Sequence, residues 1–325
     1  MFKHKNILII GDVMLDSYLF GTVERISPEA PVPIIDVTSK QYKLGGAANV
    51  AANIINLGGN PILCSIIGND QNGEIFLSLL NKIKISTHQI HQSSNRITTN
   101  KTRIIGNNHQ MVRIDEEIKT EIVEEDQNYL LKIINSVFER QNEFKINCIL
   151  FQDYDKGILN EYIINYITNL AQSLNIPIIA DPKKNNFNFY KNIILFKPNF
   201  KEFKESININ SSNRDELLKN GAEILHKKGI EIIFVTLSED GIFVSYKKDD
   251  NIINKIIPAS IINVVDVSGA GDVVLSIIPF LLDELDIEKI AKIANIAGGM
   301  VCEEIGVGTI NKDKLMKEID ILNII

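Results

Sequence analysis

The chain has 325 residues, of which 45% are hydrophobic and 23% charged, and its formal net charge is −7. This composition is ordinary for a globular protein, and a negative charge without any basic block argues against a nucleic-acid partner. The three cysteines are far apart, form no CxxC pair and suit a reducing compartment. No apolar stretch has the length of a membrane span or signal peptide, so we expect a cytoplasmic protein.

The first predicted element is a short buried strand, residues 7–10. It ends in Gly11-Asp-Val-Met-Leu-Asp16. Ligands of open α/β sheets bind beyond the carboxyl ends of strands, so Asp12 and Asp16 are placed to meet one, although Gly-Asp is also a common turn pair. Three prolines in the six residues 28–33 exclude a helix there and favour an extended segment that projects from the sheet as part of a lid.

A glycine-rich helix start follows at Gly45-Gly46. The apolar spacing predicts a helix from there to residue 57, with Asn49 one turn inside it. Unpaired amides at a helix N-terminus bind anions. The spacing is not that of a dinucleotide fingerprint, and small residues for tight helix packing explain the glycines equally well.

Two further strands form a predicted hairpin. A strand at 61–67 and a helix at 73–83 lead to strands 98–105 and 110–115, joined by Gly106-Asn-Asn108. Lys101 and Arg103 share a face by the two-residue period of a strand. A basic pair of this kind can meet a phosphate, and charges that protect a solvated edge strand are an equally good explanation.

From residue 122 onwards helices and strands alternate, which predicts a mostly parallel sheet with right-handed crossovers. Polar clusters repeatedly follow the strands, where such a sheet binds ligands. The expected helices are 122–139, 159–174, 214–228, 286–304 and 311–322, and the expected strands are 147–151, 176–180, 193–196, 232–236 and the antiparallel pair 241–246 and 252–257.

The chain is organised around Gly269-Ala-Gly-Asp272. A β-branched run, 261–267, predicts a strand before this turn, and an apolar pattern from 273 to 282 predicts a buried helix after it, which Pro279 should kink or shorten. The amides of the turn and the helix dipole form an anion site. Asp272 would then take a proton from a hydroxyl that attacks a bound phosphate; a tight turn with a helix-stabilising aspartate is the alternative.

No phosphate-binding P-loop, zinc cluster or hydrolase nucleophile elbow is present. Gly45-Gly-Ala-Ala-Asn49, Asn199-x-x-Glu202 and Asp266-x-Ser-Gly-Ala-Gly-Asp272 occur in this order in the PfkB/ribokinase family of carbohydrate kinases, which the chain resembles over nearly its whole length. The resemblance implies one α/β domain, residues 1–325, with a doubly wound, mostly parallel sheet. It also implies a small β lid from segments 17–43 and 97–115.

Four stretches resemble the branch of the family that acts on a heptose 7-phosphate: Gly11 to Asp16, Arg25-Ile-Ser-Pro-Glu-Ala-Pro-Val-Pro33, Asp153-Tyr-x-Lys-Gly157 and Asp181-Pro-Lys183. The resemblance implies ATP-dependent phosphorylation of the anomeric C1 hydroxyl of D-glycero-β-D-manno-heptose 7-phosphate. The product would be the 1,7-bisphosphate, on the route to ADP-heptose and lipopolysaccharide. The adenylyltransferase that often accompanies this kinase is not expected here, because its H-x-G-H signature is absent.

The resemblance also implies roles for individual residues. Asp272 would be the general base, and the amides of Gly269, Ala270 and Gly271 would stabilise the transferring phosphoryl group. The ATP site would comprise Asn199, Phe200, Lys201, Glu202, Thr236 and Gly241, with Glu202 acting on Mg²⁺ through water. The sugar would be held by Asp12, Asp16, Gly45, Gly46 and Asn49, and its 7-phosphate by Lys101, Arg103 and Lys156.

Three positions depart from the family's pattern. Val273 stands where threonine is usual, Lys184 where glycine is expected and Leu237 where arginine or lysine is usual. These changes bear on rate more than on reaction type. The alternatives are a kinase for another sugar or sugar phosphate, and a weakly active member that acts as a binding protein. Exposed lid strands favour a homodimer formed through the lids, with no membrane or nucleic-acid partner.

Overall fold

The computed structural model describes residues 1–325 except 141–142, 210, 250, 260–265, 304–305 and 325. In this part of the chain the strands form two sheets, of nine and four strands. The expected strand 261–267 lies mostly outside the described residues. In spatial order the large sheet comprises β13 (Asn251–Ile257), β12 (Ile242–Lys248), β11 (Ile232–Thr236), β10 (Leu195–Phe196), β9 (Ile178–Asp181), β8 (Ile146–Gln152), β1 (Asn6–Gly11), β4 (Asn60–Gly68) and β5 (Ile90–Ser93).

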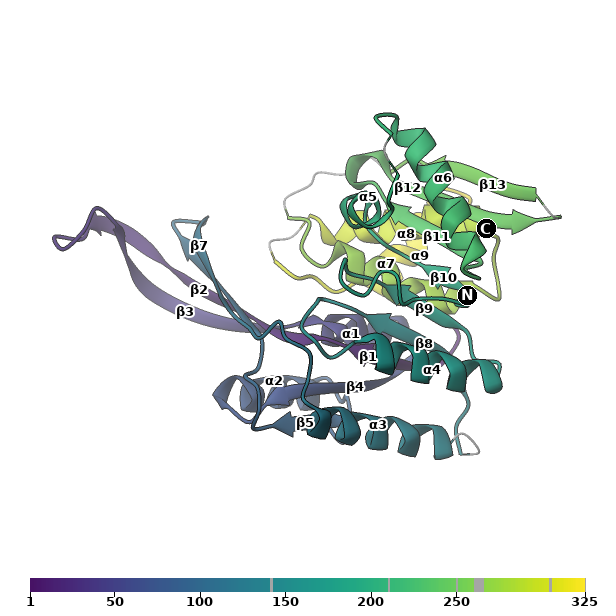
Figure 1. Cartoon of the computed structure of the whole chain (residues 1–325). Helices are drawn as coiled ribbons and strands as arrows, with labels where there is room; N and C mark the ends of the chain where they lie inside the picture. Colours follow the sequence, from purple (N-terminus) through teal and green to yellow (C-terminus); the bar gives the residue numbers. More distant parts are fainter. Residues whose placement is uncertain (141–142, 210, 250, 260–265, 304–305, 325) are drawn as a thin grey trace.

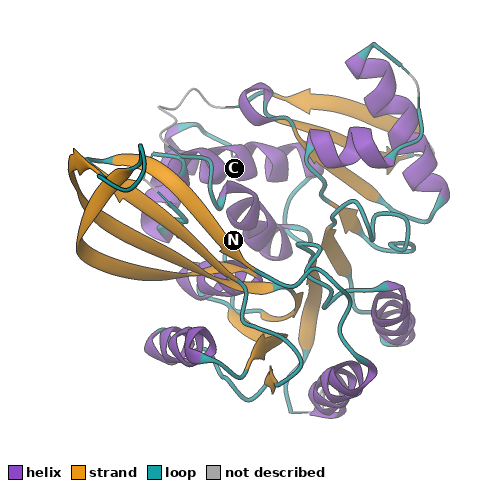
Figure 2. Ribbon diagram, turned by 60° about the vertical axis from the view of Figure 1, so that its left-hand side comes forward, coloured by secondary structure: helices purple, strands orange, loops and turns teal. Residues whose placement is uncertain are grey.

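All neighbouring strands from β5 to β11 pair in parallel, and the pairs β11–β12 and β12–β13 are antiparallel. Parallel neighbours need long crossovers, which helices supply on both faces of the sheet (Figures 1 and 2). The doubly wound α/β fold is therefore confirmed. The helices are α1 (Ala47–Leu57), α2 (Gln71–Lys82), α3 (Glu124–Glu139), α4 (Glu161–Ser173), α5 (Phe200–Ser206), α6 (Arg214–Lys227), α7 (Ala270–Leu281), α8 (Ile287–Val301) and α9 (Lys312–Ile321).

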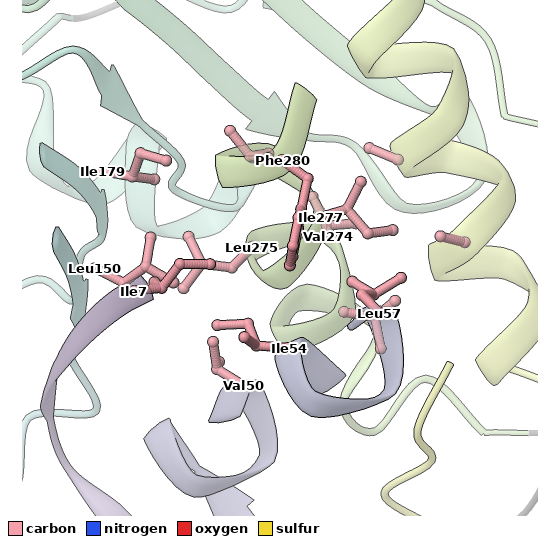
Figure 3. Close-up of a cluster of buried hydrophobic side chains, with 14 of the residues drawn as sticks. Ile7, Val50, Ile54, Leu57, Leu150, Ile179, Val274, Leu275, Ile277 and Phe280 are labelled. Atoms are coloured by element: carbon pink, nitrogen blue, oxygen red, sulfur yellow. The ribbon is translucent and has the colours of Figure 1, made fainter. Parts of the chain in front are cut away.

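The apolar run in β1 divides between two hydrophobic cores, because successive side chains of a strand point to opposite faces. Ile7 and Ile9 belong to the core beneath α1, α7 and α8, whereas Leu8 and Ile10 belong to the core beneath α3, α4 and α6. Figure 3 shows side chains of α1 and α7 gathered close to Ile7 in the first core. Both faces of β1 are thus buried, as its uninterrupted hydrophobicity predicts.

The small sheet is the lid, with strand order β3-β2-β6-β7. It consists of β2 (Val13–Ile26), β3 (Pro33–Gly46), β6 (Asn100–Gly106) and β7 (His109–Glu116), and it projects from the body of the molecule in Figure 1. The proline-rich residues lie at the exposed tip of the β2–β3 hairpin. Strand β2 begins at Val13, nearer the core than residue 17, where the lid was expected to begin. The difference arises because the first residues of β2 follow Gly11-Asp12, a pair that is typical of turns.

The boundaries of several helices differ from expectation because side chains cap them. Helix α2 begins at Gln71 and not at the expected residue 73, because Asp70 caps it by accepting a hydrogen bond from Gly73 N. Helix α4 begins at Glu161 and not at residue 159, because Asn160 is its cap. Pro279 lies inside α7, two residues before the helix ends. Two short elements, β5 and α5, have no counterpart in the sequence analysis. The sequence signal for α5 is its capping box, Asn199-x-x-Glu202.

Candidate active site

Four neighbouring parallel strands end at one edge of the large sheet, and the polar residues that follow them meet there. The strands are β1, β8, β9 and β10, followed by Asp12, Tyr154, Lys183 and Lys197 respectively. The N-termini of α1 and α7 open at the same edge, since Asn49 of α1 donates a hydrogen bond to Asp272 of α7. The structure therefore brings the early and late glycine-rich motifs together.

The turn before α7 has the geometry of an anion site. Gly269 caps the helix with a left-handed backbone, φ 84°, which favours glycine. Ala270, Gly271 and Asp272 form the first helical turn, where backbone amides have no partner within the helix. A Cβ on Gly271 would lie 3.7 Å from the Nζ of Lys197, so a cation lies beside these amides.

Asp272 is buried and accepts hydrogen bonds from three side chains. Asn49 Nδ2 lies 2.9 Å from Oδ2, while Tyr154 Oη and Gln152 Nε2 lie 2.7 and 3.1 Å from Oδ1. Burial raises the pKa of Asp272 to about 6, although the hydrogen bonds from Asn49 and Tyr154 favour the charged form. The carboxylate is thus fixed in position and has the pKa of a base that works near neutral pH. Gln152 Oε1, also buried, has no hydrogen-bond partner in the described part of the chain.

Two lysines that the sequence analysis gives no role lie beside this turn. Lys197 is 3% exposed and forms an ion pair of 2.9 Å with Asp181. Lys183 pairs with Glu202 and lies 5.1 Å from the centre of the Tyr154 ring. Lys197 could have been found from the sequence, because it is a charged residue that directly follows an apolar strand. The ion pairs with Asp181 and Glu202 hold the two ammonium groups near the N-terminus of α7.

The Asn199-x-x-Glu202 motif forms a capping box at the start of α5. Asn199 Oδ1 accepts from Glu202 N at 2.9 Å, and Glu202 Oε2 accepts from Asn199 N at 2.8 Å. Since Lys183 binds the other Glu202 oxygen, both oxygens are engaged. No group of three or more His, Cys, Asp or Glu side chains that could hold a metal occurs among the residues described. Glu202 therefore suits a water-mediated contact with Mg²⁺ better than direct ligation.

The remaining residues assigned to ATP are unequally placed. Thr236 forms an isolated parallel bridge with Asn199, so the end of β11 adjoins the capping box. Phe200 packs against the hydrophobic core, and the Lys201 side chain is 83% exposed. Gly241, φ 96°, packs so tightly against residues 257–259 that a Cβ would overlap their backbone. The structure gives Phe200 and Gly241 structural tasks and turns Lys201 towards solvent.

Asp12 and Asp16 have different surroundings. Asp12 is fully buried, and its carboxylate accepts amide hydrogens from Tyr154, Lys156 and Ile158 at 2.8, 3.2 and 3.2 Å. Asp12 therefore holds the loop after β8, and its contact with a sugar stays a prediction. Asp16 forms an ion pair with Arg103 of β6 on the lid.

Gly45 and Gly46 give the chain room at the root of the lid. A Cβ on Gly45 would overlap the Oδ2 of Asp16, and one on Gly46 would lie 2.5 Å from the carbonyl oxygen of Asp12. Gly46 also has a positive φ of 59° and precedes α1. These glycines let β3 and α1 approach the two aspartates, which places Asp16 beside the helix start that carries Asn49.

The basic residues assigned to the sugar phosphate are all paired. Arg103 binds Asp16, and Lys101 and Lys156 both bind Glu117. Lys101 and Arg103 do share one face of β6, as the strand period predicts, and Asp16 is the register partner of Lys101 on β2. The structure thus brings these cations and Asp16 into one region.

Comparisons with known proteins agree with this geometry. The family model "pfkB family carbohydrate kinase" matches residues 4–314. The chain is 34% identical to the bifunctional protein HldE of Helicobacter hepaticus over 318 residues, and 37% identical to that of Aliarcobacter butzleri over 314 residues. These alignments cover 98% and 96% of this chain and 64% of each relative. The chain thus spans slightly less than two thirds of the length of these relatives.

Solved structures share the fold. Phosphofructokinase-2 from Escherichia coli, in complex with potassium, superposes with a TM-score of 0.77 at 19% identity and covers 98% of this chain and 99% of its own. Ribokinase of Arabidopsis thaliana, complexed with ribose and ATP, gives 0.71 at 16% identity, covering 97% and 98%. Within the described ranges, none of the helices is both long and apolar enough to cross a membrane.

Proposed function

Because this chain belongs to the pfkB family of carbohydrate kinases, we propose that it phosphorylates the anomeric C1 hydroxyl of D-glycero-β-D-manno-heptose 7-phosphate with ATP. The product is the 1,7-bisphosphate, an intermediate on the route to ADP-heptose and lipopolysaccharide. The observation that carries the proposal is the Asp272 carboxylate, which lies buried in the first turn of α7, next to Gly271 and the Lys197 cation beside it. Such a site joins a base to an anion cradle.

Proton transfer is the task of Asp272. Its carboxylate takes the proton of the C1 hydroxyl as that oxygen attacks the γ-phosphorus of ATP, and the bond from the γ-phosphorus to the β,γ-bridging oxygen breaks to release ADP. Asn49, Gln152 and Tyr154 hold the carboxylate in one orientation. The unpartnered Gln152 Oε1 is an acceptor that a hydroxyl of the bound sugar can satisfy.

Charge stabilisation is the task of the α7 amides and the neighbouring cations. Negative charge on the transferring phosphoryl group is met by the amides of Ala270 and Gly271 and by Lys197, which lies beside Gly271. Lys183 adds a second cation from the end of β9. Because the two lysines are already held by ion pairs, buried for Lys197 and half-buried for Lys183, they need little rearrangement when the nucleotide arrives.

Magnesium would come with the nucleotide. The Glu202 carboxylate is a hard oxygen donor of the kind that Mg²⁺ prefers, and it lies where Asn199 and Thr236 border the proposed ATP site. Its engagement with Lys183 and the α5 amide favours contact through a water molecule. When bound, the ion neutralises charge on the β- and γ-phosphates.

Specificity for the heptose rests on sequence similarity and on the region around Asp16. The relatives that carry the name HldE align over almost the whole chain. The Arg25–Pro33 stretch that resembles the heptose kinases lies at the exposed tip of the β2–β3 hairpin. Sugar hydroxyls are expected at Asp16 and Asn49, and the 7-phosphate at Lys101, Arg103 and Lys156.

The outer face of the lid supports the further proposal of a homodimer formed lid to lid. Val112 and Ile114 of β7 are 47% and 48% exposed and lie on the opposite face from Asp115 and Arg113. A second copy of the chain that packs on this face would bury these apolar side chains. Light scattering of the purified protein tests this: a Val112→Asp variant that elutes as the wild type does would contradict it.

A substrate panel tests the function. The purified chain is incubated with ATP, Mg²⁺ and heptose 7-phosphate, fructose 6-phosphate or ribose, and products are identified by mass. We expect a heptose bisphosphate at a rate well above those of the other sugars. Turnover of fructose 6-phosphate or ribose, but not of the heptose, would instead identify a kinase for another sugar, and no turnover with any sugar would favour a binding protein.

A further inference from the structure

Three lysines converge on one carboxylate where the lid joins the core. The Nζ atoms of Lys101 and Lys156 lie 3.0 and 2.9 Å from Glu117 Oε2, and Lys119 Nζ lies 3.1 Å from Oε1. The Glu117 side chain is only 9% exposed. Burial alone would raise its pKa, but the hydrogen bonds from the lysines prevail and lower the pKa of Glu117 to about 2. The carboxylate therefore remains charged at any physiological pH.

The cluster has more positive than negative charge. Lys101 is shared between Glu117 and Asp115, and Asp115 also binds Arg113 through both of its oxygens. Four cationic side chains, counting Lys119 and Lys156 as well, thus face two carboxylates. A phosphomonoester carries up to two charges and three acceptor oxygens, so it matches several converging lysines better than a single carboxylate does.

This cluster adjoins the catalytic residues. Lys156 lies two residues beyond Tyr154, whose hydroxyl contacts Asp272, and the amides of both residues bind Asp12. Lys101 contributes to the positive field at Asp16, which its neighbour Arg103 binds directly. An acceptor with its reacting hydroxyl at Asp272 would therefore meet these lysines with a more distant part of the molecule.

A purely mechanical role for Glu117 as a strut between lid and core does not account for the lysines. The segment after Glu117 is already fixed to the loop after β8, because Ile122 N donates to the carbonyl oxygen of Gly157 at 3.0 Å. Gly157, φ 84°, packs so closely on Thr120 that a Cβ would overlap the Thr120 carbonyl oxygen. Backbone contacts already hold the junction between lid and core. A structural role for Glu117 would need only one ion pair, whereas three lysines contact its carboxylate.

We propose that Glu117 is the resident anion of the acceptor's phosphate subsite, and that the phosphate of the sugar displaces it from Lys101, Lys119 and Lys156. Glu117 then acts as a selectivity filter. An incoming monoanion only replaces the charge that it expels, whereas a phosphate dianion gains a second charge among the same lysines. This inference deepens the proposed function, since it assumes a phosphorylated acceptor, and it adds Lys119 and Glu117 to the site.

Titration with inorganic phosphate tests the proposal directly. The full chain is titrated calorimetrically at pH 8, with a non-hydrolysable ATP analogue and Mg²⁺ present so that the α7 cradle is filled. We expect Glu117→Gln to bind phosphate at least tenfold more tightly than the wild type, and Lys156→Ala at least tenfold more weakly. Glu121→Gln is the matched control, because Glu121 is exposed and forms no ion pair among the described residues. Its phosphate affinity should match the wild type.

Selectivity gives a second readout. Acetate should not bind detectably to the wild type but should bind to Glu117→Gln, and the KM for the phosphorylated sugar should fall in this variant while the KM for ATP stays constant. Phosphate affinity in Glu117→Gln that equals or falls below that of the wild type would overturn the proposal. If this variant shows no cooperative thermal transition, Glu117→Ala, which also removes the carboxylate, replaces it, and phosphate affinity equal to or below that of the wild type would again overturn the proposal.

The outcome separates this inference from the proposed function. A wild type that phosphorylates another sugar phosphate but not the heptose ends the functional proposal, and the phosphate titrations still decide the role of Glu117. A wild type that phosphorylates the heptose, together with a Glu117→Gln variant of unchanged phosphate affinity, ends the present inference alone.

Discussion

The hydrogen bond from Tyr154 to Asp272 makes a quantitative prediction about pH dependence. At 2.7 Å it joins a neutral donor to a buried carboxylate, and it favours the charged form of Asp272, whose pKa is about 6. Hydrogen bonds to charged groups contribute about 1.5–3 kcal/mol, and about 1.4 kcal/mol corresponds to one pKa unit. In Tyr154→Phe the pKa of Asp272 should therefore rise to roughly 7–8.

The direction of the pH shift follows from the role of Asp272 as the general base. A general base works only when it is deprotonated, so activity is lost as pH falls through its pKa. A higher pKa moves that loss to higher pH. The lower limb of the kcat/KM profile, which reports the free enzyme, should thus shift upward by about one to two pH units in Tyr154→Phe. The sugar phosphate also titrates near pH 6, but it does so equally with both proteins and cancels in the comparison.

A matched variant controls for the loss of a phenol hydroxyl. Tyr166 on α4 donates to Asn135 at 2.9 Å, on the other face of the sheet from α7. Tyr166→Phe should leave the profile in place. An active Tyr154→Phe enzyme whose lower limb stays fixed or moves to lower pH would refute the assignment of Asp272 as the base that Tyr154 tunes.

Three further predictions concern the same site. Asp272→Asn should reduce kcat by about 10²–10⁴ while circular dichroism shows a native fold, and a smaller loss would point to another base. Lys197→Met should lower the free energy of unfolding by about 3–5 kcal/mol in urea titrations, because it leaves the Asp181 carboxylate buried without its partner; a loss below about 1 kcal/mol would mean that Asp181 finds another donor. Gly45→Ala should raise the KM for the sugar much more than that for ATP, since the new methyl group displaces the Asp16 carboxylate, and equal effects on both would contradict this role.

The sequence located the parts of the site that are local in the chain. The turn before α7 and the helix start at Gly45-Gly46 were identified from their glycines, and the contact between Asn49 and Asp272 joins them. Both motifs can be recognised in the sequence because a glycine turn directly precedes an apolar helix. The doubly wound sheet was equally accessible from the alternation of apolar periods.

The contacts that could not be predicted from the sequence join segments that are far apart in the chain. Asp12 receives the amide of Tyr154 from 142 residues away, and nothing local distinguishes that task from sugar binding. Gln152 is the polar end of an apolar strand, and only the packing of β8 beside α7 brings it to Asp272. The pairing of Lys156 with Glu117 likewise needs the lid to fold back on the core.

A single residue, Asp12, separates the central strand β1 from the lid strand β2. Its amide is bound to the Gln152 carbonyl oxygen at 3.0 Å, and its carboxylate grips the loop that carries Tyr154. A change in the angle of the lid at this joint would therefore act, through the Asp12 carboxylate, on the loop whose tyrosine orients Asp272. One buried aspartate thus links the position of the four-stranded sheet to the geometry of the carboxylate at the sheet edge.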